Sequence, residues 1–476
     1  MALSSTGGWR WWVGLAMAWT GGLGTGVLGE GLPSRLKVMP PTLQSGQVSL
    51  GWEVPGEGWT FRVEEADEPG MPWALAPGGA TGLSRNWLDG RMADGASRIF
   101  RVVSETPVVN RGALISAERT ATYNIATLTF LFAFGGVPVT PQHEVEVYRV
   151  VYQTVDPWGL PTRASASLAV PRRAGRIWPL LAYQHGTITA DSEAPSAAAS
   201  TEGLIGVVLA SNGYVAVLAD LLGFGESGGN HPYHHAASTA TAVVDAMRVG
   251  RKWCGTNGVP LSDQVFLAGY SQGGHATLAV LQELEARHEG EFTVTACSAM
   301  AGAYDLSGVA LDDALSDRQP PNGYYFAYLL QTLVDLYQVA PNLGSLLRAP
   351  YSATIPPLMT QQGWGDLVNQ ALPDVPHQAL NPEFLRALRA DPGHPVRRAL
   401  RENDVTGFVP KAPLRLYHCS GDQDVLPANT TVARDRFVAA GANQVQVLDP
   451  QSGASHTDCV QPALLATKAW FDSLKQ

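Results

Sequence analysis

The chain has 476 residues, of which 45% are hydrophobic and 16% charged, and its formal net charge is −10. This length exceeds that of one ordinary domain, and the apolar content is typical of globular proteins with a large core. An acidic balance without a Lys/Arg run disfavours nucleic-acid partners and docking on anionic lipid. The composition is compatible with transient contact with a neutral lipid interface. Nothing in the sequence indicates an obligate protein partner.

The first thirty residues follow the order of a secretory signal. Arg10 supplies a positive charge, Trp11–Trp19 form an apolar run too short to span a bilayer, and small residues follow. We therefore predict a signal peptide over residues 1–30 and a secreted, periplasmic or cell-surface protein. The alternative is an N-terminus that packs in the core or has no fixed structure.

Residues 31–106 show short alternating stretches separated by Pro/Gly-rich turns, the pattern of a small β domain. Three of these stretches are Gln47–Trp52, Phe61–Glu64 and Arg98–Val103. About six such strands around a central tryptophan, here Trp52, resemble a fibronectin type III sandwich. That resemblance implies a spacer or adhesion role and no chemistry.

From residue 112 to 476, short apolar runs alternate with helix-like segments. The runs include Pro179–Tyr183, Val215–Ala219, Val265–Ala268 and Leu414–Tyr417. Runs of this kind are typical of buried parallel strands, so the alternation predicts an α/β fold with a doubly wound sheet. A helical stretch over about residues 305–411 interrupts it, and its length favours a cap or lid over another sheet unit.

Two pentapeptides fit G-x-S-x-G, one centred on Ser271 and one on Ser227. A nucleophile elbow of this sequence needs a strand before the serine and a helix after it. Ser271 follows the apolar run Val265–Ala268 and precedes His275–His288, where apolar residues recur at helical spacing. Ser227 leads into Gly229–Tyr233, which cannot begin a regular helix. We therefore predict Ser271 as the nucleophile and Ser227 as a loop residue.

A serine nucleophile needs a histidine to take its proton and a carboxylate to orient that histidine. In this fold the chain order is serine, acid, histidine. The strand Leu414–Tyr417 opens into a loop that carries both Asp422 and Asp424, and either could be the acid or an ordinary turn residue. His456 lies in a Gly/Ser-rich loop before the last helical segment and is the predicted base.

The negative charge that develops on the substrate oxygen needs backbone N–H donors. One is predicted to be the amide of Gln272, just after the nucleophile. The other is expected from the loop after the first parallel strand, at Gly186 or Thr187, although an ordinary turn would explain that loop equally. The chemistry requires no cofactor.

His231, His234 and His235 form an HxxHH pattern that could suggest a metal. The pattern lacks a nearby carboxylate, and imidazoles alone on a loop seldom make a site. We therefore predict no metal.

Four stretches carry a family resemblance: Tyr183-Gln-His-Gly-Thr, Asp220-Leu-Leu-Gly-Phe-Gly-Glu-Ser with His231-Pro-Tyr, Gly269-Tyr-Ser-Gln-Gly-Gly, and His418–Thr430. Over about residues 147–476 the chain resembles the secretory lipases, the fungal lipase A type and their bacterial relatives among the α/β-hydrolases. The resemblance implies a helical lid over an apolar acyl pocket. It also implies Asp422 as the acid, three residues before Val425, although Leu426 replaces the proline usual after that valine.

These observations predict an esterase or lipase that works through Ser271, Asp422 and His456. A serine peptidase of the prolyl-oligopeptidase type would share the triad, but the roughly 75 residues before the catalytic region are too few for a propeller. A non-catalytic surface-binding protein is the third interpretation, which the β domain keeps open. Three reactive residues retained in the expected order argue against it.

The four cysteines are Cys254, Cys297, Cys419 and Cys459. An even count in an exported chain predicts two disulfides. Cys419 lies three residues before Asp422 and Cys459 three residues after His456, so a triad that joins those loops would bring this pair together. Cys254 and Cys297 are then expected to form the second bridge.

Overall fold

The computed structural model describes seven strands between residues 37 and 105, together with residues 110–173 and 175–476. The signal peptide predicted over residues 1–30 lies outside these described residues. The chain divides into two compact units, residues 1–109 with 155–161 and residues 110–154 with 162–476.

The strands of the N-terminal unit form two antiparallel sheets. In one, β3 (Gln47–Glu53) pairs with β1 (Lys37–Val38), β2 (Thr42–Gln44) and β6 (Asn86–Met92). In the other, β4 (Thr60–Ala66) lies between β5 (Ala74–Gly82) and β7 (Ile99–Glu105). Trp52 is only 2% exposed, and its ring centroid lies 5.7 Å from that of Phe61 in the other sheet. The fibronectin type III assignment stays a prediction.

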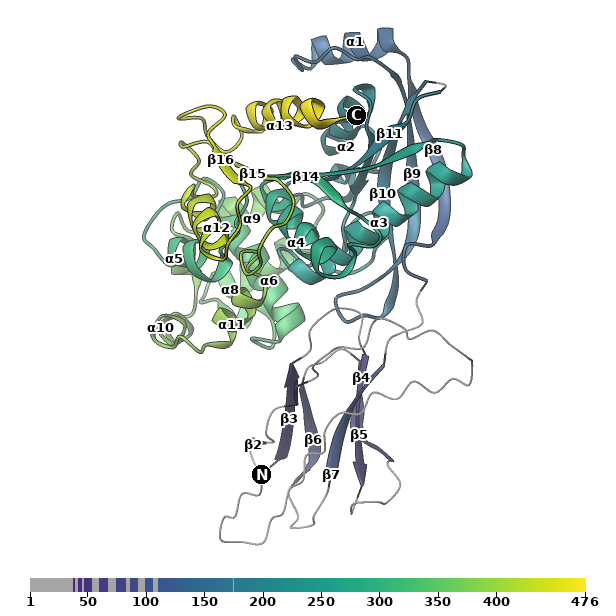
Figure 1. Ribbon diagram of the computed structural model, residues 1–476. Coiled ribbons are helices and arrows are strands. Elements are labelled where there is room, and N and C mark those ends of the chain that lie inside the picture. The colour runs from purple at the N-terminus through teal and green to yellow at the C-terminus, as the bar shows by residue number, and fades with distance from the viewer. Residues whose placement is uncertain are drawn as a thin grey trace. The chain divides into compact units, whose positions relative to one another are not determined.

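The larger unit is built on a nine-stranded sheet with the order β16-β15-β14-β13-β11-β12-β10-β9-β8 (Figure 1). The strands are β8 (Leu114–Tyr123), β9 (Glu144–Val155), β10 (Pro161–Arg172), β11 (Trp178–Gln184), β12 (Val215–Ala219), β13 (Leu261–Tyr270), β14 (Val294–Met300), β15 (Leu414–Tyr417) and β16 (Val445–Leu448). Strands β11 to β16 run parallel, whereas β10 is antiparallel to β12 and β8 to β9.

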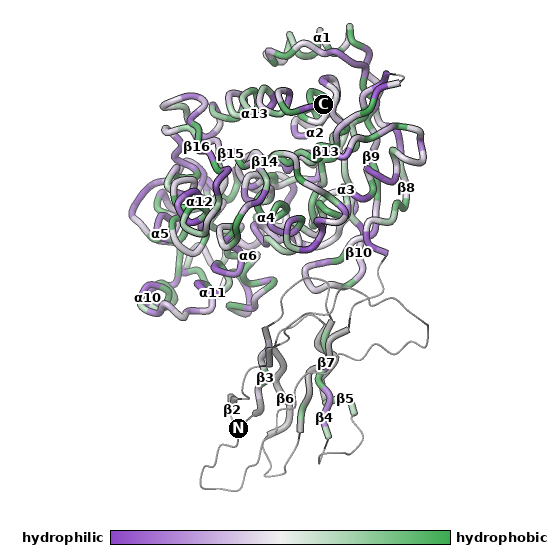
Figure 2. Tube along the Cα trace, viewed as in Figure 1, coloured by the Kyte–Doolittle hydropathy of each residue, from purple (hydrophilic) through white to green (hydrophobic). Residues whose placement is uncertain are grey.

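Helices cover both faces of this sheet. On one face lie α3 (Ala236–Thr256), α4 (Gln272–Arg287) and α12 (Ala428–Ala439), and on the other α1 (Ile125–Phe134), α2 (Thr201–Ser211) and α13 (Val460–Leu474). Adjacent strand residues point to opposite faces, so Leu180 joins one core and Leu181 the other. Apolar runs follow the central strands in Figure 2 because both faces are buried.

Between β14 and β15 the chain makes the predicted helical excursion. Its main helices are α5 (Leu311–Ala314), α6 (Tyr324–Tyr337), α7 (Leu343–Leu346), α8 (Tyr351–Leu358), α9 (Gly365–Ala371), α10 (Pro382–Ala390) and α11 (Pro395–Glu402). They enclose apolar cores of their own, one of them around Tyr328, Ile355 and Trp364. We call residues 305–411 the helical insertion. Among the described residues, no helix has the length and apolar content needed to cross a membrane.

Candidate active site

Ser271 occupies a strained turn between β13 and α4. Its φ of 60° and ψ of −121° lie where side chains are disfavoured, and the turn lifts the serine out of the sheet. The two flanking glycines leave no space for a side chain. A Cβ on Gly273 would lie 1.9 Å from the carbonyl oxygen of Gln184. A Cβ on Gly269 would lie 2.3 Å from the carbonyl oxygen of Gly273. This crowding is the physical reason for the G-x-S-x-G pattern here.

Ser271, His456 and Asp422 form a continuous chain of contacts. Ser271 Oγ lies 2.8 Å from His456 Nε2, and His456 Nδ1 lies 2.5 Å from Asp422 Oδ2. Because a carboxylate only accepts, Nδ1–H donates to Asp422, which leaves Nε2 able to accept the serine proton. All three side chains are buried. Ser271 comes from the end of β13, Asp422 from the loop after β15, and His456 from the loop before α13.

The two aspartates that the sequence left open occupy different environments. Asp422 Oδ1 accepts the backbone N–H groups of Asp424 and Val425, each at 2.9 Å. The side chain of Asp424 instead accepts a hydrogen bond of 2.9 Å from Asn322 in the helical insertion. Burial alone would raise the pKa of Asp422, but hydrogen bonds from His418 and His456 outweigh it and hold that pKa well below its usual value.

The predicted oxyanion donors lie beside Ser271. A Cβ placed on Gly186 would be 3.9 Å from the Cβ of Ser271. The amides of Gln272 and Thr187 have no protein acceptor within the described residues, so both remain able to donate. The Gly186 N–H points instead to Glu202 Oε1 at 3.3 Å. Of the two loop candidates, Thr187 is therefore the one with an available amide.

Sequence reasoning missed two contacts that support these donor residues. The Gln272 side-chain amide donates to His231 Nε2 at 2.6 Å, while His231 Nδ1–H donates to the carbonyl of Leu222 at 2.7 Å. Burial lowers the pKa of His231 to about 3 and keeps it neutral. The hydroxyl groups of Tyr233 and Thr187 lie 3.0 Å apart. The His231-Pro-Tyr motif was the sequence signal for both contacts.

The histidines considered for a metal are engaged separately. His235 accepts the Ser238 N–H at the start of α3, and the His234 ring packs against that of His275, with centroids 4.7 Å apart. Within the described part of the chain, no group of His, Cys, Asp and Glu side chains is arranged to hold a metal ion.

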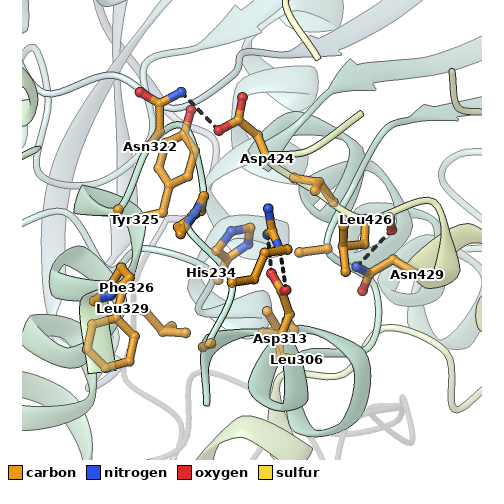
Figure 3. Close-up of a pocket in the computed structure, with 18 of the residues that line it drawn as sticks. His234, Leu306, Asp313, Asn322, Tyr325, Phe326, Leu329, Asp424, Leu426 and Asn429 are labelled. Carbon is orange, nitrogen blue, oxygen red and sulfur yellow. Dashed lines mark hydrogen bonds and ion pairs between the residues drawn. The ribbon is translucent and has the colours of Figure 1, made fainter. Parts of the chain in front are cut away.

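We call residues 418–427, between β15 and α12, the acid loop. A cavity of about 130 Å³ lies between the acid loop and the helical insertion (Figure 3). Asp424 and Leu426 line it from the acid loop, and Leu306, Phe326 and Leu329 line it from the insertion. His234 also reaches this cavity. Its walls are mostly apolar, with the Asn322–Asp424 hydrogen bond at one edge.

A disulfide joins Cys419 to Cys459, with their Cα atoms 5.9 Å apart. It links the acid loop to the start of α13, directly after the His456 loop. The second predicted bridge is wrong, because Cys254 and Cys297 are free buried thiols. Cys254 belongs to α3 and Cys297 to β14, and α4 packs against both of these elements.

Solved structures with this fold include several hydrolases. The rice cell wall degrading esterase LipA from Xanthomonas oryzae is 28% identical, with a TM-score of 0.66 over 76% of this chain and 96% of that one. A Legionella pneumophila protein designated a hydrolase is 24% identical, with a TM-score of 0.70 over 76% and 98% of the two chains. Candida antarctica lipase A is 19% identical, with a TM-score of 0.57 over 77% and 84%.

No protein-family model and no curated protein matches the sequence. The sheet topology and the similar structures nevertheless define a carboxylic ester hydrolase of the α/β-hydrolase fold. Within that class, the chain is similar to the esterase LipA and, in fold, to lipase A. The non-catalytic interpretation of the sequence is set aside.

Proposed function

We propose that the protein is an exported serine esterase or lipase, with Ser271 as nucleophile, His456 as base and Asp422 as acid. The observation that carries this proposal is the pair of contacts Ser271 Oγ to His456 Nε2, 2.8 Å, and His456 Nδ1 to Asp422 Oδ2, 2.5 Å, at a nucleophile elbow. These atoms are within hydrogen-bond reach in the order that proton transfer needs.

In the first half of the reaction, Ser271 Oγ attacks the carbonyl carbon of the ester while His456 Nε2 takes its proton. The carbonyl oxygen becomes an oxyanion that the amides of Gln272 and Thr187 stabilise, a contribution worth about 10²- to 10³-fold per donor in rate. His456 then protonates the leaving alcohol oxygen, and an acyl-enzyme remains on Ser271. In the second half, His456 takes a proton from a water that attacks the acyl carbon, and it then returns the proton to Ser271 Oγ as the bond between that oxygen and the acyl carbon breaks and the carboxylic acid leaves.

Asp422 holds His456 in the tautomer that can accept the serine proton. Its Oδ2 fixes the proton on Nδ1 and faces the positive charge that His456 acquires when it holds the serine proton. Because Asp422 is fully buried, this charge pair is poorly screened by solvent.

We also propose that the helical insertion is a lid and that the 130 Å³ cavity receives the acyl group. The apolar walls from Leu306, Phe326 and Leu329 support this assignment. The X. oryzae esterase is named for degrading cell walls and the Candida enzyme is a lipase, so the substrates proposed here are small-molecule or lipid esters. The peptidase alternative has no comparable support.

Export is proposed on two grounds. Disulfides such as Cys419–Cys459 persist in oxidising compartments, and the N-terminal thirty residues have the order of a secretory signal.

Hydrolysis of a chain-length series of nitrophenyl esters tests the proposal. Ser271→Ala is expected to lower kcat by about 10⁴-fold or more while the protein stays folded. Ser227→Ala is the matched control from the second G-x-S-x-G, because among the described residues its Oγ forms a single long hydrogen bond, to the Gly228 carbonyl at 3.5 Å. Activity retained in Ser271→Ala and lost in Ser227→Ala would overturn the assignment. The length that wild type prefers then defines the acyl group.

A further inference from the structure

A second histidine contacts the carboxylate of Asp422. His418 is the first residue after β15, is buried, and stands four residues before Asp422. Its Nε2 lies 3.1 Å from Asp422 Oδ2, the oxygen that also accepts from His456. The same Nε2 lies 2.8 Å from the carbonyl oxygen of Val425. His418 therefore contacts both the acid and the backbone of the acid loop.

The partners of His418 determine where its proton lies. A carboxylate and a carbonyl can only accept, so Nε2 carries the hydrogen and donates to both. On the other side of the ring, Nδ1 lies 2.6 Å from Thr430 Oγ1, whose hydroxyl can donate to it. A neutral imidazole thus satisfies both nitrogens. His418 acts as a donor of fixed orientation and needs no charge of its own.

Within the described part of the chain, the Asp422 carboxylate receives four hydrogen-bond donors, and its residue is 0% exposed. Two backbone amides hold Oδ1, and the two imidazoles hold Oδ2. An ionised carboxylate with 0% exposure is costly unless its lone pairs are filled. Without His418, Oδ2 would keep His456 as its single partner. The carboxylate would then be held less firmly at Oδ2, and its ionised form would lose a stabilising hydrogen bond.

We infer that His418 is a positioning residue that holds the Asp422 carboxylate in place for His456. The inference rests on the proposed function, because it gives His418 a role only through the acid of the triad. Under this inference, loss of the His418 hydrogen bond lowers kcat. A merely structural role would instead affect folding and leave the kcat of the folded variant unchanged.

Two nearly isosteric substitutions separate the hydrogen bond from packing. His418→Met fills the space and has no donor, and its kcat is expected to fall about 10- to 100-fold with KM little changed. His418→Gln can place an amide N–H near the position of Nε2, and its kcat is expected to stay within about threefold of wild type. A role in packing alone would give the two variants similar kcat values.

Thr430→Val is the control for stability. It removes the partner of Nδ1 and leaves the Nε2 donor, so its thermal midpoint should fall while its kcat stays near that of wild type. A His418→Met variant that keeps wild-type kcat, or a folded His418→Gln variant that loses as much as His418→Met, would overturn the inference. If His418→Met does not fold, a folded His418→Gln variant decides: kcat near wild type supports the inference, and a tenfold loss overturns it.

Ser271→Ala, assayed beside these variants, separates the two proposals. If Ser271→Ala remains active, the triad itself is wrong. If Ser271→Ala is inactive and His418→Met keeps its kcat, only the role of His418 is wrong.

Discussion

The hydroxyl groups of Tyr233 and Thr187 lie 3.0 Å apart and join the segments that follow two neighbouring parallel strands, β12 and β11. The phenol ring of Tyr233 is also stacked on Tyr328 of α6, with centroids 4.4 Å apart and planes 1° from parallel. Tyr233 is thus held between the helical insertion and the residue whose amide is proposed to stabilise the oxyanion.

Tyr233→Phe should keep the stack on Tyr328 and remove the hydrogen bond to Thr187. A neutral hydrogen bond contributes about 1 kcal/mol, so we expect kcat to fall about fivefold with little change in KM. A double-mutant cycle with Thr187→Val measures the coupling, because the second substitution should cost little once the first is made. Strictly additive effects on kcat would show that this hydrogen bond does not support the reaction.

The two aspartates of the acid loop should respond very differently to replacement by asparagine. Asp422→Asn removes the charge that faces His456 and favours the wrong tautomer, so kcat should fall by about 10⁴-fold. Asp424→Asn should lower it by less than about tenfold, because its side chain bonds Asn322 rather than the base. Steady-state kinetics of both variants decide, and a larger loss in Asp424→Asn would transfer the acid role to that residue.

Removal of the Cys419–Cys459 bridge should lower both the stability of the fold and the temperature at which activity is lost. The bridge closes a loop with a sequence separation of 40, for which chain entropy predicts a stabilisation of about 4 kcal/mol. The double variant Cys419→Ser/Cys459→Ser should unfold at a lower urea concentration and lose activity at a lower temperature. A variant with Cys254→Ala and Cys297→Ala is the control, and it should respond to reductant as wild type does. An unchanged urea midpoint in the first variant would contradict the prediction.

Stability should fall as the pH drops below about 6.5, in part because His275 is buried in its neutral form. Burial lowers the pKa of His275 to about 4, so between these values the unfolded chain binds a proton that the folded protein does not. This difference destabilises the fold by about 1.4 kcal/mol per pH unit for one such group.

His275→Gln tests the origin of that slope. Glutamine can keep a donor to the Asn403 carbonyl, which lies 2.8 Å from His275 Nε2, and it does not titrate. Urea unfolding at pH 6.5 and pH 5 should therefore show a smaller loss of stability in the variant than in wild type. Equal losses in the two proteins would mean that His275 does not contribute to the slope.

The sequence indicated the sheet and the strand, turn and helix around Ser271 well, because both depend on local patterns. The run Val265–Ala268, the two glycines around Ser271 and the amphipathic segment after it identify a strand, a turn and a helix from neighbouring residues alone. The helical insertion was equally visible from its length and periodicity. The role of residues 31–106 was not, because alternating strands describe many β domains.

What the sequence could not resolve were contacts between loops that are distant along the chain. Asp422 and Asp424 follow the same strand, and only the direction of each side chain places Asp422 against His456 and Asp424 against the insertion. In the sequence, His418 is an ordinary residue at the end of a strand, and only the structure shows its ring beside Asp422. The predicted Cys254–Cys297 bridge was wrong because the pair was chosen by elimination, and two cysteines that are both buried need not lie within bonding distance.

The backbone of Ser271 sets the stability of the fold against the proposed catalytic role of this residue. A φ of 60° suits glycine, and a non-glycine residue there carries strain of about 1–3 kcal/mol. Ser271→Gly would relieve that strain, offset in part by the greater freedom of glycine in the unfolded chain, and should raise the free energy of unfolding by roughly 1 kcal/mol. Under the proposed mechanism, this more stable variant would be inactive. Screens that select variants for heat resistance alone would therefore favour loss of the nucleophile, and engineering of this enzyme has to select for turnover at the same time.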